Sequence, residues 1–120
     1  PDLLIVQDPT LFHAIDVFSG LRNHGYLLIN SARSPTELGI DEALQRLPTG
    51  HVMTVPATEL ALKYLKRPTP NTVLLGALTA VRDEIGLDSV FTAIRQKFPG
   101  PIGELNVQAA QAAHDSVAVA

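Results

Sequence analysis

The strongest constraint on this chain is a pair of short apolar runs, each of which ends abruptly in polar residues. Residues 3–6 run into Gln7, and residues 26–29 run into Asn30. Neither run alternates between apolar and polar side chains, which is typical of parallel strands covered on both faces. Open α/β sheets bind ligands at the carboxyl ends of their strands, so the polar residues after each run become the first candidates for function.

A third apolar run, residues 52–55, continues this pattern, and predicted helices separate the three runs. Asp8 followed by Pro9 is typical of a helix start, and it predicts a helix that ends near Ser19. The stretch Ser34-Pro35-Thr36-Glu37 is a capping-box pattern and predicts a second helix, with a possible interruption at Gly39. This alternation predicts an α/β fold with a mostly parallel, Rossmann-like βαβαβ sheet and right-handed crossovers.

The remainder of the chain is predicted to be helical. We expect helices at about residues 57–66, at 72–83 after a cap by Asn71, from a cap by Asp88 to Pro99, and in the alanine-rich tail 102–120. The helix over 72–83 has few charged residues on any face. It is therefore expected to be buried or to lie against a partner chain.

Composition limits the class of protein. A chain of 120 residues, with 46% hydrophobic and 18% charged residues, is expected to form a single globular domain over residues 1–120. The net charge of -3 and the scattered basic residues argue against nucleic acid as a partner. No apolar stretch reaches the roughly 20 residues that span a membrane, and we expect a cytoplasmic protein. Because Pro1 leads almost directly into a strand, the sequence is interpreted as part of something longer.

Several kinds of chemistry lack their usual residues. The chain has no Cys, which excludes disulfides, thiolate nucleophiles and iron–sulfur clusters held by this chain. The four His residues are far apart in sequence and show no metal-binding spacing. The sequence contains neither a nucleophile elbow nor a glycine-rich phosphate loop. We therefore assign no catalytic residue and no metal ligand, and any redox centre must be held elsewhere.

The sharpest candidate site consists of Asn30, Ser31 and Arg33. These residues place an amide, a hydroxyl and a guanidinium at a strand's carboxyl end, just before a predicted helix. Such an arrangement suits a phosphate or a carboxylate. A structural salt bridge or an interface contact of Arg33 is the alternative. Glu59, after the third strand, is interpreted as a first-turn acid that favours its helix dipole.

Five short stretches, in a fixed order, resemble one protein family. They are Val6-Gln7-Asp8-Pro9-Thr10, Gly25-Tyr26-Leu27-Leu28-Ile29-Asn30-Ser31, Val55-Pro56-Ala57-Thr58-Glu59, Pro70-Asn71-Thr72-Val73-Leu74-Leu75-Gly76-Ala77 and Glu104-Leu105-Asn106-Val107. Together they are similar to the gamma subunit, or equivalent domain, of the 2-oxoacid:ferredoxin oxidoreductases, which act on pyruvate, 2-oxoglutarate, 2-oxoisovalerate and related acids. The resemblance covers nearly the whole chain.

The resemblance implies a three-layer α/β/α domain within an enzyme that oxidatively decarboxylates a 2-oxoacid. In that family, thiamine diphosphate with Mg²⁺ and the iron–sulfur clusters belong to alpha, beta and ferredoxin-like subunits or domains. Electrons leave to ferredoxin, and coenzyme A usually accepts the acyl group. This chain is therefore expected to hold no cofactor alone, to lack catalytic residues, and to contribute to assembly and to the coenzyme A side.

One motif of the family is missing from this sequence. The family's domain opens with a glycine-rich loop of the R-G-G-Q-G kind, ahead of the stretch that matches Pro1. Residues 1–120 are accordingly interpreted as the carboxyl-terminal two-thirds of a gamma domain. If the chain keeps part of a coenzyme A site, physical reasoning places it at Asn30, Ser31 and Arg33.

Two other hypotheses stay open. The chain could be a freestanding Rossmann-like module that binds a nucleotide or carboxylate at residues 30–34. It could also be a structural half-domain that another polypeptide completes.

Overall fold

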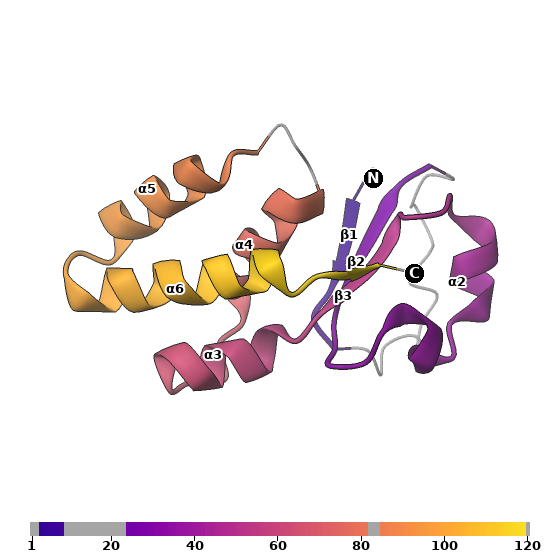
Figure 1. Cartoon of the computed structure of the whole chain (residues 1–120), viewed down its shortest axis with the longest axis horizontal. Helices are drawn as coiled ribbons and strands as arrows, with labels where there is room; N and C mark the ends of the chain where they lie inside the picture. The colour runs from indigo at the N-terminus through magenta and orange to yellow at the C-terminus, as the bar shows by residue number, and fades with distance from the viewer. Residues whose placement is uncertain (1–2, 9–23, 82–84, 120) are drawn as a thin grey trace. The chain divides into compact units, whose positions relative to one another are not determined.

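The computed structural model describes residues 3–8, 24–81 and 85–119, which fall into two compact units (Figure 1). The first unit contains residues 1–55 and 118–120, and the second contains residues 56–117. The helix predicted from Asp8 and Pro9 to about Ser19 lies outside the described residues.

The first unit is built on a sheet whose strands follow the order β1-β2-β3-β4. The strands are β1 (Leu3–Val6), β2 (Tyr26–Asn30), β3 (Val52–Val55) and β4 (Ala118–Val119). β2 pairs in parallel with both β1 and β3, while β4 pairs antiparallel with β3. The α/β class, the mostly parallel sheet and its three predicted strands are therefore confirmed.

Burial explains why two of the apolar runs do not alternate. Leu27, Leu28 and Ile29 of β2 are all fully buried, and so are the four residues of β3. The prediction of a fully covered strand is wrong for β1, where Ile5 is 37% exposed. Among the described residues β1 ends the strand order, so it lacks a second neighbouring strand there.

A short crossover joins β2 to β3 and covers part of the sheet. It consists of a 3₁₀ turn, η1 (Pro35–Leu38), and the helix α2 (Asp41–Arg46), with Gly39 between them at a φ of +70°. The predicted start after Ser34 and the break at Gly39 are both confirmed. The apolar cluster between crossover and sheet includes Ile40, Leu44, Leu47, Leu27, Ile29 and Val52.

The second unit is a group of four helices. They are α3 (Ala57–Leu65), α4 (Asn71–Val81), α5 (Leu87–Lys97) and α6 (Pro101–Asp115). No helix in the described ranges has the length and apolar content that crossing a membrane requires. All four predicted helices are present. Asn71, which was predicted to cap α4, is instead its first residue, and two further corrections concern the ends of α5 and α6.

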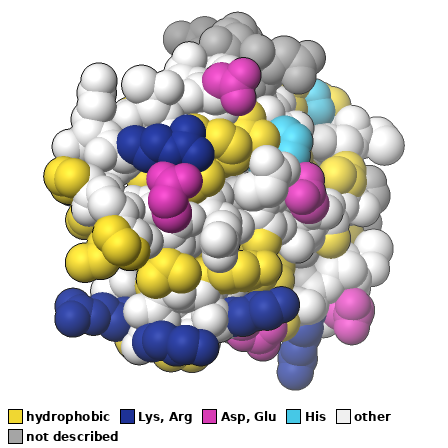
Figure 2. Space-filling view, turned by 60° about the vertical axis from the view of Figure 1, so that its left-hand side comes forward, with side chains coloured by type: hydrophobic (Ala, Val, Ile, Leu, Met, Phe, Trp, Pro, Cys, Tyr) yellow, Lys and Arg dark blue, Asp and Glu magenta, His cyan; other side chains and the backbone are white. Residues whose placement is uncertain are grey.

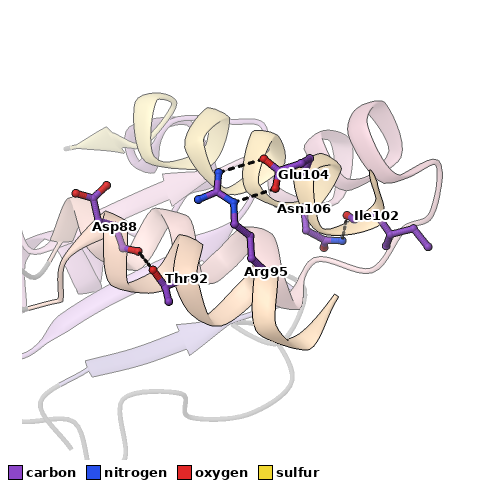
Figure 3. Close-up of polar contacts among 6 residues, drawn as sticks. All are labelled: Asp88, Thr92, Arg95, Ile102, Glu104 and Asn106. Atoms are coloured by element: carbon purple, nitrogen blue, oxygen red, sulfur yellow. Dashed lines mark hydrogen bonds and ion pairs between the residues drawn. The ribbon is translucent and has the colours of Figure 1, made fainter. Parts of the chain in front are cut away.

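The first correction concerns the start of α5. Gly86, in an extended conformation, occupies the cap position, and Asp88 lies within the first turn instead. A carboxylate there still favours the helix dipole. The Asp88 carbonyl accepts a hydrogen bond from the Thr92 hydroxyl at 3.0 Å (Figure 3).

The second correction concerns the alanine-rich tail, which is not helical throughout. α6 ends at Asp115, and Ala118 and Val119 pair with Thr54 and Met53 of β3. Val117 and Val119 are β-branched, and such residues fit a strand better than a helix. The many alanines before them have high helix propensity, so the sequence predicted that the helix would continue through these residues.

Small residues allow the backbones of α4 and α6 to lie in direct contact. A Cβ added to Gly76 would lie 2.0 Å from the carbonyl oxygen of Ala110. Ala77, Ala109 and Ala113 are fully buried as well. The apolar character of α4 is thus explained by its burial in the second unit, as the sequence predicted.

A hydrogen bond between side chains joins the same two helices. The buried Thr79 hydroxyl donates its proton to the Gly76 carbonyl oxygen at 2.6 Å. The hydroxyl has one proton, so its 2.8 Å contact with His114 Nδ1 must be a hydrogen bond that it accepts. His114 therefore carries a proton on Nδ1.

Polar contacts also connect α5 to α6 and satisfy a buried amide (Figure 3). The Arg95 guanidinium donates two hydrogen bonds to the Glu104 carboxylate, at 2.9 and 3.1 Å. These bonds lower the pKa of Glu104, but both side chains are about half exposed, so the pair contributes little stability. The predicted buried hydrogen bond of Asn106 is confirmed by its 2.9 Å bond to the Ile102 carbonyl oxygen.

We predict that Gly76→Ala destabilises the protein by roughly 1–3 kcal/mol, because the new methyl would overlap the backbone of Ala110. The measurement is the free energy of unfolding in urea. Leu75→Ala is the control, since Leu75 is the exposed neighbour on the same helix. A gain in stability, as Gly→Ala gives in an open helix, would contradict the close approach.

We predict that Thr79→Val costs about 1–3 kcal/mol, because it leaves the Nδ1 proton of His114 without its acceptor. Thr79→Ser keeps the hydroxyl and should retain most of the stability. Nitrogen NMR of the imidazole should report the Nδ1-protonated tautomer in the wild type and in Thr79→Ser. An Nε2-protonated neutral ring in the wild type would disprove this hydrogen-bond assignment.

Candidate functional site

The candidate residues lie at the carboxyl end of β2, between two parallel neighbours. Asn30 is the last residue of this strand and pairs in register with Val55 of β3. On the other side, the Asn30 side-chain amide donates a hydrogen bond to the Gln7 carbonyl oxygen at 3.1 Å. The Ser31 backbone amide donates to the Val55 carbonyl oxygen at 2.9 Å. Asn30 and Ser31 therefore hold the ends of the three parallel strands together.

Ser31 also shapes the loop that carries Arg33. The Ser31 hydroxyl oxygen accepts a hydrogen bond from the Arg33 backbone amide at 3.0 Å. This local turn places Arg33 on the surface, where its side chain is exposed. Among the described residues, no carboxylate forms an ion pair with the Arg33 guanidinium. The structure thus brings Asn30, Ser31 and Arg33 together at one strand end.

The turn after Arg33 already contains an anion. The Glu37 carboxylate accepts hydrogen bonds from the Ser34 hydroxyl at 2.7 Å and from the Ser34 backbone amide at 3.1 Å. These bonds, with a smaller contribution from the charge of Arg33, lower the pKa of Glu37. The capping-box spacing was the sequence signal for this contact.

This contact changes the argument for anion binding. η1 has four residues, so it offers no extended helix dipole, and the backbone amide of Ser34, just before it, is committed to Glu37. The physical case for a ligand therefore depends on the exposed guanidinium of Arg33 and on its position at the strand ends. The assignment of Asn30, Ser31 and Arg33 to a ligand stays a prediction.

The polar residues within β3 and just after it have structural explanations. Thr54 is buried within the strand, and its register partner in β4 is Ala118. Glu59 lies in the first turn of α3, the position expected for an acid that favours the helix dipole.

Histidine contacts in the described residues are structural. The His51 ring stacks on Tyr26 with centroids 4.0 Å apart. Its Nδ1 lies 3.0 and 3.1 Å from the carbonyl oxygens of His24 and Gly25, so Nδ1 is the protonated nitrogen. His13 lies outside the described residues.

The described residues form no grouping of side chains that is typical of a metal site. No cluster of three or more His, Cys, Asp or Glu side chains occurs in the described part of the chain. The full sequence has no Cys to ligate an iron–sulfur cluster. We therefore derive no cluster or metal chemistry from these residues.

A concave feature lies wholly within the helical unit. It is an open groove of about 680 Å³ on the surface of α6, between Tyr64 of α3 and Phe91 of α5. Gln111, on its lining, donates hydrogen bonds to Asp115 at 3.1 and 3.2 Å. Its lining residues come from three helices, so no local sequence pattern indicated it.

Comparison with known proteins identifies the family. Residues 1–116 match the model of the pyruvate ferredoxin/flavodoxin oxidoreductase family. Pyruvate synthase subunit PorC of Methanothermobacter marburgensis is 37% identical over 117 residues, which cover 98% of this chain and 60% of that protein. The pyruvate/ketoisovalerate oxidoreductases common subunit gamma of Thermococcus kodakarensis is 37% identical over 119 residues, which cover 99% of this chain and 63% of that protein.

A solved structure agrees with these sequence matches. The crystal structure of pyruvate oxidoreductase subunit PORC from Thermotoga maritima matches with a TM-score of 0.78 and 29% identity, over 98% of this chain and 64% of that one. The chain thus spans between 60% and 64% of the length of these three proteins. The predicted resemblance is confirmed, and the chain belongs to the pyruvate ferredoxin/flavodoxin oxidoreductase family.

Proposed function

We propose that residues 1–120 form the carboxyl-terminal two-thirds of a gamma subunit, or equivalent domain, of a 2-oxoacid:ferredoxin oxidoreductase. The complete enzyme would convert a 2-oxoacid to acyl-coenzyme A and CO₂ and reduce ferredoxin. The observation that carries this proposal is the match over 98% of the chain to a protein named as a pyruvate synthase subunit. The similar fold of a pyruvate oxidoreductase subunit supports it.

The proposed role of this chain is structural and not catalytic. Thiamine diphosphate, Mg²⁺ and iron–sulfur clusters would be held by alpha, beta and ferredoxin-like subunits or domains, in the cytoplasm. The composition of the chain supports this division, because it has no Cys and its candidate site has no nucleophile or general base in a recognisable arrangement. The chain would help to assemble the complex and would contribute to the coenzyme A side.

The contribution to coenzyme A would come from the end of β2. Coenzyme A carries phosphate groups, and Arg33 offers an exposed guanidinium without a carboxylate partner among the described residues. The Ser31 hydroxyl fixes the turn beneath it by accepting from the Arg33 amide. The Glu37 carboxylate is hydrogen-bonded to Ser34 and forms no ion pair with Arg33 among the described residues, although the charge of Arg33 contributes to its lowered pKa.

We predict that the full-length protein co-purifies in a fixed ratio with the thiamine-binding and cluster-binding subunits of its source organism. The measurement is native purification followed by mass spectrometry and an absorbance spectrum for iron–sulfur clusters. Recovery of the chain without these subunits, together with saturable binding of an adenine nucleotide, would instead support a freestanding binding module.

We predict that Arg33→Ala in the assembled enzyme raises the KM for coenzyme A by roughly 10-fold or more, since a charge-assisted hydrogen bond contributes about 1.5–3 kcal/mol. The KM for the 2-oxoacid should stay unchanged. Arg46→Ala is the control, because Arg46 is an exposed arginine on α2 of the same crossover. An unchanged KM for coenzyme A in Arg33→Ala would remove Arg33 from the site.

A further inference from the structure

Three basic residues gather where α3 ends. Lys63 lies in its last turn, Lys66 caps it, and Arg67 follows directly. All three side chains are exposed, and within the described residues none of them forms an ion pair with a carboxylate. Cations at a helix carboxyl end are favourable, but that effect alone does not require three of them.

Lys66 ends α3 in the left-handed backbone conformation. Lys66 has a φ of +60°, and it is the one non-glycine residue with a positive φ in the part of the chain that the structure describes. Glycine is the residue that usually ends a helix in this conformation, because a Cβ there is strained. Lys66 ends the helix in this conformation, and its backbone amide donates a hydrogen bond to the Leu62 carbonyl oxygen at 3.2 Å. A lysine in place of glycine also adds a positive charge to this exposed helix end.

Exposed aliphatic side chains accompany these charges. Leu62, on the last turns of α3, is 47% exposed, and Ile102 and Leu105, at the start of α6, are 63% and 41% exposed. In Figure 1 the end of α3 and the start of α6 lie at the same end of the helical unit. Figure 2, which brings that end forward, shows apolar side chains in a band beside a row of Lys and Arg. We call Leu62, Ile102, Leu105, Lys63, Lys66 and Arg67 the apolar–basic surface.

Two features restrain the chain at the end of α3. Pro68 and Pro70 follow Arg67 directly, and prolines restrict the connector to extended conformations. The Lys66 ammonium donates a hydrogen bond to the Lys63 carbonyl oxygen at 3.1 Å, which further restrains that side chain. A surface that is ordered before binding loses less entropy when a partner docks.

The charge and the apolar character of this surface indicate which kind of partner would bind it. A second copy of the chain would bring the same cations against each other, which is unfavourable. Single-stranded nucleic acid needs aromatic side chains for stacking, whereas the centre here is aliphatic and the chain has a net charge of -3. A protein surface with an apolar centre and acidic residues at its rim complements both features.

We propose that the apolar–basic surface docks an acidic-rimmed surface of another subunit of the oxidoreductase. This inference rests on the proposed function, because it requires that the chain assembles with such subunits. It goes beyond that function in two ways. It assigns the contact to the end of the helical unit, and it states that the partner surface is acidic at its rim.

The test uses the full-length protein and the purified subcomplex of the remaining subunits, with the dissociation constant measured at low and at high salt. Arg67→Glu should raise the dissociation constant at least about tenfold at low salt, and the effect should shrink at high salt as charges are screened. Leu105→Ser should weaken binding at both salt concentrations. Arg46→Glu, the same charge change on the first unit, should have less than about a twofold effect.

The outcomes separate this inference from the proposed function. Equal effects of Arg67→Glu and Arg46→Glu, or no effect of Arg67→Glu while the wild type still assembles, would overturn the docking surface and leave the proposed function intact. A wild-type chain that binds none of the other subunits would overturn both. Circular dichroism of each variant verifies that a weaker association does not come from unfolding.

Discussion

Contact between the backbones of α4 and α6 determines how the helical unit can pack. Because Gly76 has no side chain, the two helices come close enough for the Thr79 hydroxyl to reach His114. α5 then packs its apolar side chains against α6, and α3 packs against both α4 and α6. The groove and the apolar–basic surface both use residues of α6, so a shift of this helix would change both together.

The strands and helices that follow from local patterns were predictable, and those that depend on distant neighbours were not. The apolar run at β2 predicted a buried strand because its residues contact the core on both faces. The same pattern at β1 overestimated its burial, because exposure depends on which strands lie beside it. β4 was missed because its two residues form a strand only through pairing with β3.

The candidate site shows the same division. The sequence alone predicted that Asn30, Ser31 and Arg33 lie at one strand end, since they are neighbours in the chain. It did not predict that the Asn30 amide would bond to Gln7, 23 residues away. It also treated the turn after Arg33 as an anion site, although the capping-box glutamate supplies a carboxylate there itself. A capping box is thus evidence that a helix amino terminus is partly occupied.

The placement of the two tyrosines, one of which stacks on His51, has a practical consequence for how folding can be observed. The chain has two tyrosines and no tryptophan, and each compact unit contains one tyrosine: Tyr26 in the first and Tyr64 in the second. Tyrosine fluorescence is therefore not masked by indole emission. Replacing either ring with phenylalanine leaves a single intrinsic probe in one unit, so the two halves of the molecule can be followed separately as they unfold. Coincident transitions would mean that they behave as one cooperative structure.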